Sequence, residues 1–227
     1  MKPALGGQVG FAVRIYFVYI LAMTAEEFLP PAPRLRVEPL LRFQRYRDLD
    51  KVAPAIREVA EEMVRAAEKL AVPKVAFMLR QVHHVGPATL AVADGPTFSG
   101  RCFTTHISQA SQVVCFLITI GPDLDDRVTE MASGDELLEA LFLDTAGWLA
   151  IEDALRAFRR HLAGRVRPQG LRLSPRLGPG FLDWPLTDQQ EFFSIFSGVP
   201  LPVKVSEHSV MTPKKSISGL FGLLPSV

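Results

Sequence analysis

The chain has 227 residues, 48% of them hydrophobic, and its 25 basic and 24 acidic side chains give a net charge of +1. The length and hydrophobic content are typical of a globular protein with a sizeable core. The balanced charge predicts no nucleic-acid partner, because binding a phosphate backbone requires a clustered basic surface, and the arginines are scattered along the sequence.

The N-terminus begins with an apolar leader at residues 1–22. Residues 9–22 are apolar apart from Arg14, and this run is shorter than the roughly 20 apolar residues that a spanning helix needs. It resembles a signal peptide with Lys2 at its charged end; a periplasmic or membrane-tethered protein is a further interpretation. We favour a misassigned start, with translation beginning at Met23, and therefore expect a cytoplasmic protein without a membrane segment.

A proline-rich lead-in at residues 28–37 precedes the first predicted helix. Over residues 48–71, apolar side chains recur at steps of three and four, with Asp48 or Asp50 as the N-cap and Pro73 at the end. Short runs rich in β-branched and aromatic residues then predict strands at residues 75–79, 88–93, 101–107 and 113–120. The last of these is apolar on both faces, as expected for a central strand.

Two helices are predicted next, over residues 122–132 and 135–163. Gly147 interrupts the second at a cost of about 1 kcal/mol relative to alanine. Close packing of a strand explains such a glycine better than a ligand does, although both explanations stand. The chain then continues into a short helix at residues 188–197, with Thr187 and Gln190 as a capping box. Strands joined by a turn at Thr212-Pro213 complete one predicted domain over residues 23–227.

The loop at residues 172–186 is the strongest functional candidate. Three prolines stiffen it, since proline fixes its own φ and restrains the residue before it, and it carries Arg172 and Arg176. Gly178 and Gly180 lack the Cβ atoms that would keep a ligand away from the backbone. A guanidinium held in a stiff loop is suited to a ligand that carries a carboxylate.

Other chemistries lack the patterns that they need. Cys102 and Cys115 form no CxxC pair, and we expect two buried free thiols rather than a disulfide. The histidines show no HExxH or HxH spacing, so no metal site is predicted. There is no GxGxxG after a strand and no GxSxG, and Lys215 lacks the glycine of a phosphate-binding loop. No catalytic side chain is predicted.

Two C-terminal stretches resemble a known family. Residues 172–186 read R-x-S-P-R-x-x-P-G-F-x-D-W-P-L, and residues 206–219 read S-E-x-x-x-M-x-P-x-K-S-I-S-G. Both are similar to the activation (reactivation) domain of vitamin B12-dependent methionine synthase, and in particular to its standalone bacterial form. The resemblance is strongest over residues 172–222. With the elements above, the predicted fold is α/β (α+β), a twisted, largely antiparallel sheet flanked by helices.

The resemblance implies a repair step that supports methionine biosynthesis. The family domain binds S-adenosylmethionine and presents its methyl group to cob(II)alamin, and a flavodoxin-type donor supplies one electron. The sequence contains no Asp-x-His-x-x-Gly motif, so the cobalamin is expected on a partner protein. That partner is either a corrinoid-binding methyltransferase or a truncated methionine synthase. The alternative is a non-catalytic assembly or binding partner of a corrinoid methyltransferase, with a degenerate ligand site.

The resemblance also assigns ligand contacts within the loop. Arg176 matches the arginine that grips the ligand's carboxylate. Gly178 matches a small residue whose backbone contacts the ligand, and Pro179 and Gly180 match the family motif directly. Phe181 stands where the family domain has a tyrosine.

Two further contacts lie outside the loop. Phe221 takes the place of a second tyrosine, so at both phenylalanine positions stacking or a cation–π contact is retained and a hydroxyl hydrogen bond is lost. Glu152 matches an acidic residue on the family's long helix. A solvated helix carboxylate is the alternative interpretation of Glu152.

Overall fold

A seven-stranded antiparallel sheet is the centre of the fold in the computed structural model, which describes residues 25–226. The strand order is β4-β3-β2-β5-β9-β6, with β1 paired to β2, and every pairing is antiparallel. The strands are β1 Glu26–Phe28, β2 Lys74–Gly86, β3 Thr89–Val92, β4 Thr97–Ser99, β5 Gln112–Thr119, β6 Leu171–Leu173 and β9 Ser216–Pro225. A separate two-stranded sheet joins β7 Lys204–Val205 to β8 Met211–Thr212. The leader prediction for residues 1–22 lies outside the described residues.

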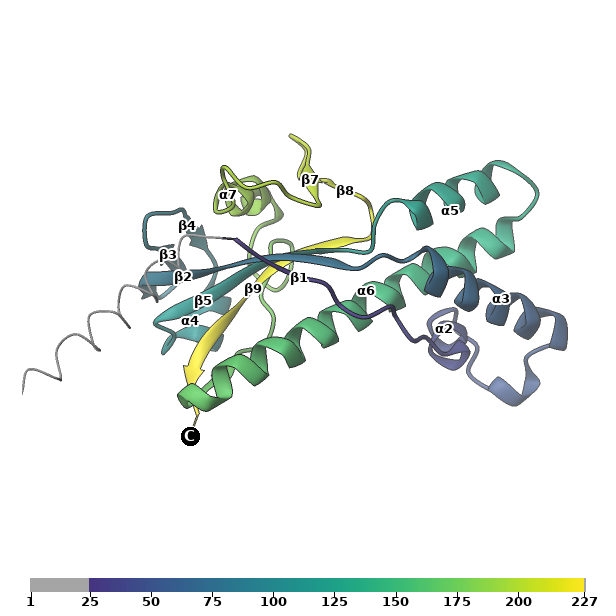
Figure 1. Ribbon diagram of the computed structural model, residues 1–227, viewed down its shortest axis with the longest axis horizontal. Coiled ribbons are helices and arrows are strands. Elements are labelled where there is room, and N and C mark those ends of the chain that lie inside the picture. The colour runs from purple at the N-terminus through teal and green to yellow at the C-terminus, as the bar shows by residue number, and fades with distance from the viewer. Residues whose placement is uncertain (1–24, 227) are drawn as a thin grey trace, which may run out of the picture.

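Helices flank this sheet on both sides (Figure 1). They are α2 Val37–Phe43, α3 Pro54–Leu70, α4 Arg101–Ile107, α5 Asp123–Ser133, α6 Leu137–Val166 and α7 Gln189–Ser194, with short 3₁₀ turns at Leu49–Lys51, Arg167–Gln169 and Leu186–Asp188. Helix α6 crosses one face of the sheet, with α2, α3 and α5 around its N-terminal half, and α7 lies beyond the opposite side (Figure 1). The predicted α/β fold class with a largely antiparallel sheet flanked by helices is confirmed. No helix within residues 25–226 is both long and apolar enough to span a membrane.

Strand β5 separates two hydrophobic cores. Its residues Val114, Phe116 and Ile118 face the core beneath α3 and α6. The alternate residues Val113, Cys115 and Leu117 face a second core, which includes Trp184 and side chains of α4 and α7. Successive side chains of a strand point to opposite faces, so a strand between two cores must be apolar throughout, as predicted. Both cysteines are free and buried, which confirms the expected thiols.

The prediction of a strand at residues 101–107 is wrong, because this segment is helix α4. Its first-turn N–H groups receive a cap from outside the segment: the Asp183 carboxylate accepts from the N–H of Arg101 at 2.8 Å and of Cys102 at 2.9 Å. A carboxylate at a helix N-terminus satisfies unpaired donors and interacts favourably with the helix dipole. The two threonines that favoured a strand, Thr104 and Thr105, instead donate their hydroxyls to the backbone carbonyls of Gly86 and Arg101.

The predicted helix caps are also corrected. Helix α3 begins at Pro54, and Asp48 caps only the 3₁₀ turn before it, by accepting from the Asp50 N–H. Helix α7 has no side-chain cap. Gln190, expected in a capping box, donates instead to the carbonyls of Ser206 and Glu207.

The tail differs in its pairing from the prediction. Thr212-Pro213 is a cis peptide bond that leads from β8 towards β9, so the predicted turn is present. However, β8 pairs with β7, whereas β9 enters the main sheet between β5 and β6.

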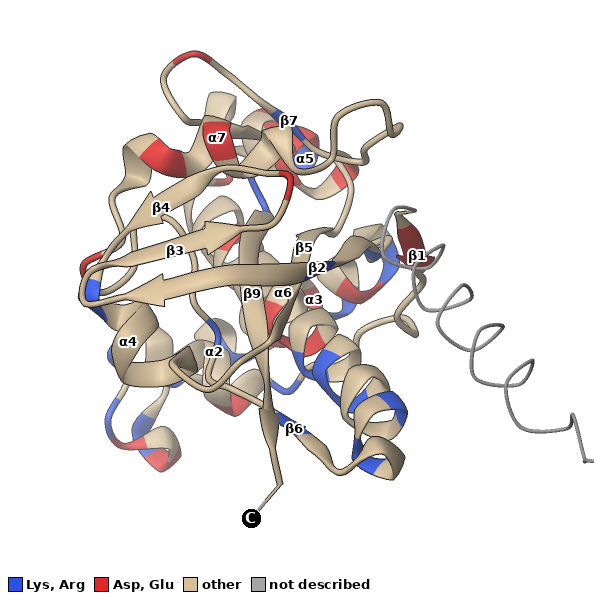
Figure 2. Cartoon of the chain, turned by 90° about the vertical axis from the view of Figure 1, so that its left-hand side faces the viewer, with Lys and Arg blue, Asp and Glu red and all other residues tan. Residues whose placement is uncertain are grey.

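Charged residues of both signs lie over the molecule, and arginines gather on the C-terminal third of α6 (Figure 2). Most of these arginines contact other groups of the protein. Arg156 pairs with Asp153 at 3.1 Å, Arg159 donates to the Ser174 carbonyl at 3.0 Å, and Arg165 pairs with Glu26.

Candidate functional site

The proline loop between β6 and α7 lies directly against β9. Leu177 and Leu220 exchange two backbone hydrogen bonds, of 3.1 and 2.8 Å. Ser174 adds two more to Gly222: its N–H donates to the Gly222 carbonyl, and its hydroxyl oxygen accepts from the Gly222 N–H, each at 2.9 Å. The loop therefore continues the sheet as an irregular edge, and its position is fixed by β9.

Glycines allow this close contact. A Cβ added at Gly178 would lie 2.8 Å from the Ser218 carbonyl oxygen, and one at Gly219 would lie 2.5 Å from the Leu177 carbonyl oxygen. Both distances are shorter than any Cβ contact that a folded chain accepts. The missing side chain of Gly178 is thus explained by backbone packing on β9, whereas the sequence suggested access for a ligand. Gly180 has a φ of +84° and forms the turn in which its N–H donates to the Trp184 carbonyl at 2.9 Å.

Arg176 and Phe181 lie together at the surface of this loop. The guanidinium carbon of Arg176 is 4.5 Å from the centroid of the Phe181 ring, and Phe181 is 54% exposed. Within residues 25–226, no carboxylate lies within ion-pair distance of Arg176. A Cβ at Gly219 would lie 3.2 Å from Phe116, which faces the core under α6, and 3.5 Å from the Arg176 Cγ, so the Arg176 side chain starts on the α6 side of the sheet. The loop therefore presents a stacked guanidinium whose charge is free to bind an anionic group.

A second anchor fixes the far end of the loop on the opposite side of the sheet. The backbone N–H groups of Arg101 and Cys102 lower the pKa of Asp183 to about 2. Burial, followed by the hydrogen bond to Asp183, raises the pKa of Cys102 to about 11, so this thiol stays protonated at neutral pH. The next residue, Trp184, is buried, and its indole N–H donates to Asp188 at 3.1 Å. The loop is thus held at β9, at α4 and in the second core.

On α6, Asp144, Trp148 and Glu152 follow one another at steps of four residues and share one face of the helix. Lys215 lies against this face: its Nζ is 2.5 Å from Asp144 Oδ1 and 5.4 Å from the centre of the Trp148 ring. Asp125 adds a third contact at 3.6 Å. Lys215 is 3% exposed, so it joins the start of β9 to α5 and α6 and is not available to a phosphate.

The same contact explains Gly147. A Cβ there would lie 2.7 Å from Leu124 Cδ2 and 3.0 Å from Lys215 Cε. Packing within the protein therefore accounts for the glycine in the middle of α6, but the nearest atom belongs to Leu124 of helix α5, whereas the favoured explanation was close packing of a strand.

The site residues named from the sequence fall into three places. Residues 176 and 178–181 lie on one loop, Gly178 and Pro179 buried and Gly180 exposed. Glu152 is half-buried one helical turn beyond Trp148. Phe221 is fully buried in the core under α6, where its ring stacks on Phe116 with centroids 5.0 Å apart. The expectation that Phe221 faces a ligand is not met in this structure, because its ring has no exposed surface.

Sequence reasoning missed the contributions of Asp144, Trp148, Asp183 and Lys215. The only local signal was their position: Asp183 and Lys215 lie inside the two family-like stretches, and the other two lie on the long helix. Within residues 25–226, no three His, Cys, Asp or Glu side chains are placed to hold a metal ion.

Comparison with known proteins finds similarity to solved structures. No protein-family model and no curated protein sequence matches the chain. Among solved structures, it is similar to the MetH reactivation domain bound to AdoHcy, with a TM-score of 0.55 and 15% sequence identity over 90% of this chain and 80% of that chain. At this identity the likeness concerns the fold, and it agrees with the fold that the sequence resemblance implied.

Proposed function

We propose that this protein binds S-adenosylmethionine beside residues 176–181 and supports reductive remethylation of cob(II)alamin on a separate corrinoid protein. The observation that carries the proposal is the Arg176 guanidinium, stacked on the exposed Phe181 ring and without a carboxylate partner among the described residues. The fold supports it, since the MetH reactivation domain of similar fold was solved with AdoHcy, the demethylated form of this ligand.

The placement of side chains along β9 suits a ligand of this kind. Lys215 contacts Trp148, and the Arg176 Cγ lies 3.5 Å from the position that a Cβ of Gly219, four residues later, would occupy. Four residues of extended chain span about 13 Å. Trp148 is 41% exposed and offers an aromatic surface for a purine at one end, and Arg176 offers a bidentate partner for an amino-acid carboxylate at the other. Glu152, one turn from Trp148 on the same face of α6, would supply a carboxylate for the ribose hydroxyls or the ligand's ammonium group.

The chemistry would depend on orientation. The partner's cobalamin would supply the acceptor for the methyl group, and one electron from a flavodoxin-type donor would be consumed for each methyl transferred, with S-adenosylhomocysteine released. This chain would hold the ligand so that its methyl group faces the partner. A corrinoid-binding methyltransferase or a truncated methionine synthase fits that partner role. We therefore expect this exchange to take place in the cytoplasm.

Calorimetry with S-adenosylmethionine tests the proposal. A charged, bidentate hydrogen bond contributes about 1.5–3 kcal/mol, so Arg176→Ala is expected to weaken binding about 10- to 150-fold. Arg172→Ala is the matched control, because Arg172 is an exposed arginine on the neighbouring strand β6. No binding to the wild-type protein at millimolar ligand would overturn the proposal, and equal losses in both variants would mean that only the overall charge matters.

The second candidate is a non-catalytic assembly partner of a corrinoid methyltransferase with a degenerate ligand site. The burial of Phe221 favours it, because one of the two aromatic positions assigned to the ligand is part of the core. The same titration separates the two candidates, since an assembly partner would bind the corrinoid protein without binding S-adenosylmethionine.

A further inference from the structure

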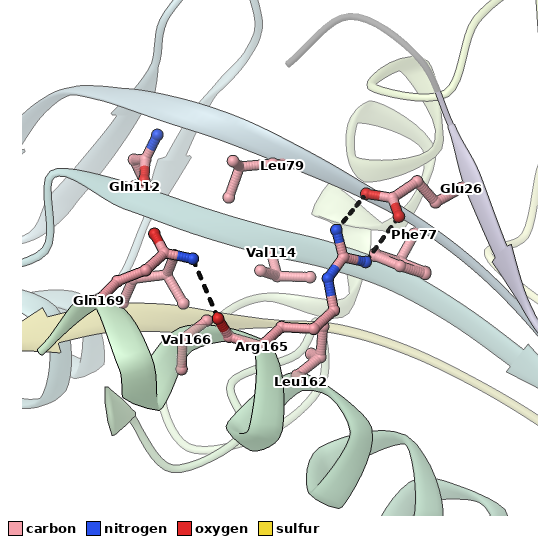
Figure 3. Close-up of a pocket in the computed structure, with 10 residues that line it drawn as sticks. Glu26, Phe77, Leu79, Gln112, Val114, Leu162, Arg165, Val166 and Gln169 are labelled. Carbon is pink, nitrogen blue, oxygen red and sulfur yellow. Dashed lines mark hydrogen bonds and ion pairs between the residues drawn. The ribbon is translucent and has the colours of Figure 1, made fainter. Parts of the chain in front are cut away.

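A second candidate binding site lies away from the loop, between the sheet and the C-terminal end of α6 (Figure 3). It is a half-open cavity of about 160 Å³. Its apolar walls are Phe77, Leu79, Val114, Leu162, Val166 and Leu223. None of the side chains assigned to S-adenosylmethionine lines it.

The polar groups at its rim leave the cavity without an unpaired charge. Arg165 binds Glu26 through two hydrogen bonds, of 2.6 and 3.1 Å, so each charge is neutralised by the other. Gln169 donates one N–H to the Arg165 carbonyl at 3.0 Å and keeps its amide oxygen free within the described part of the chain. Gln112 lies on the same side of the cavity as Gln169, and Figure 3 shows both carboxamides at the end opposite to Glu26.

Size and shape limit the ligand. An apolar cavity of about 150 Å³ holds a benzene molecule, so this one has room for a small ring system and not for a nucleoside with an amino-acid tail. The cavity lies between the side chains of β2, β5 and β9 on one side and those of helix α6 on the other, and a planar molecule fits between two such layers. A charged ligand would lose its hydration without gaining a free counter-ion.

We propose that this cavity binds a neutral, planar aromatic molecule of one or two rings. Its ring packs between Val114 and Leu162, and a polar edge, such as an amide or a ring nitrogen, hydrogen-bonds to the carboxamides of Gln112 and Gln169. This site is separate from the one assigned to S-adenosylmethionine, and neither depends on the other.

Methyl NMR of the full chain tests this inference with benzamide as the probe and benzoate as its charged counterpart. Benzamide is expected to shift the methyl signals of Val114, Leu162 and Val166 in a saturable manner, and benzoate is expected to bind at least tenfold more weakly. Methyl signals of Leu90, in the core on the other face of the sheet, serve as the control and stay unchanged.

Two variants locate the binding. Val114→Phe fills the cavity and abolishes the saturable shifts. Gln169→Leu, a change at an exposed position, weakens the binding of benzamide at least threefold and leaves the binding of toluene unchanged. The proposal would be overturned if benzamide caused no saturable shifts in the folded wild-type protein. The titration would start at a 10-fold molar excess and continue to the solubility limit of benzamide. Equal binding of benzamide and benzoate, or unchanged binding by Gln169→Leu, would refute the assigned ligand class.

Discussion

We expect alanine substitution at the two glycines within α6 to change the stability of the protein in opposite directions. Gly147→Ala and Gly164→Ala each add one methyl group to the same helix, and each gains up to about 1 kcal/mol of helix propensity. At Gly164, no atom of residues 25–226 outside the helix's own backbone lies within 4 Å of the added Cβ. We therefore expect Gly164→Ala to stabilise the protein by about 0.5–1 kcal/mol.

At Gly147 the added Cβ would meet side chains that are held in place. Leu124, 2.7 Å away, is completely buried, and the ammonium group of Lys215, whose Cε is 3.0 Å away, is bound to Asp144. Overpacking of this kind costs about 1–3 kcal/mol, which exceeds the helix gain. The net expectation is a loss of up to about 2 kcal/mol, and a difference between the two variants of about 1–3 kcal/mol.

Urea unfolding followed by far-ultraviolet circular dichroism measures that difference. Both variants should keep the wild-type slope and move only the midpoint, since neither alters the surface exposed on unfolding. If Gly147→Ala is as stable as Gly164→Ala, then Leu124 and Lys215 are free to move. The close packing of α5 and of Lys215 on α6 would then not be a fixed feature of the fold.

Three further predictions concern the same framework. Lys215→Met keeps the buried stem and removes the ammonium group that Asp144 binds, so unfolding free energy should fall by about 1–3 kcal/mol in urea titrations; an unchanged midpoint would contradict the anchoring role. The pKa of Asp183 falls from 3.8 to about 2 on folding, so its stabilising contribution is present above pH 3.8 and is lost as pH falls through that interval. Asp183→Asn should lower the melting temperature at neutral pH and flatten this acid dependence, and a variant with the wild-type profile would refute the assignment. Phe221→Tyr should destabilise the protein by about 1–3 kcal/mol in thermal or urea unfolding, whereas Phe181→Tyr should stay within about 0.5 kcal/mol of the wild type; equal stability of the two would be inconsistent with the burial of Phe221.

Much of the sheet and its helices could be predicted because their signals are local. The run at residues 113–120 is apolar on both faces, and β5 is the strand between two cores. Helix α4 shows the limit of local signals. Its β-branched threonines favour a strand, yet its N-terminus is capped by Asp183, 82 residues away from Arg101 in sequence. A cap supplied by a distant loop leaves no pattern in the segment that it stabilises.

The candidate loop also combines features that local sequence predicts with contacts that it does not. Prolines and arginines within residues 172–186 identified it as a stiff, charged segment, and the structure places it on a sheet edge. The sequence could not show what Gly178 approaches, because its neighbour is the backbone of Ser218, forty residues later. Nor could it show that Lys215 reaches Asp144, since that contact depends on how β9 crosses α6.

The two phenylalanines that stand where the sequence resemblance implied tyrosines differ in burial. Phe221 packs among Phe116, Phe158 and the guanidinium of Arg159, where a hydroxyl would need a buried partner. Its lack of a hydroxyl is therefore a requirement of this core. Phe181 is exposed and stacks on Arg176, so a hydroxyl there would cost little and its absence bears directly on a ligand. The binding that we propose for S-adenosylmethionine would thus depend on Arg176 and Phe181, with Trp148 and Glu152 as the other proposed contacts.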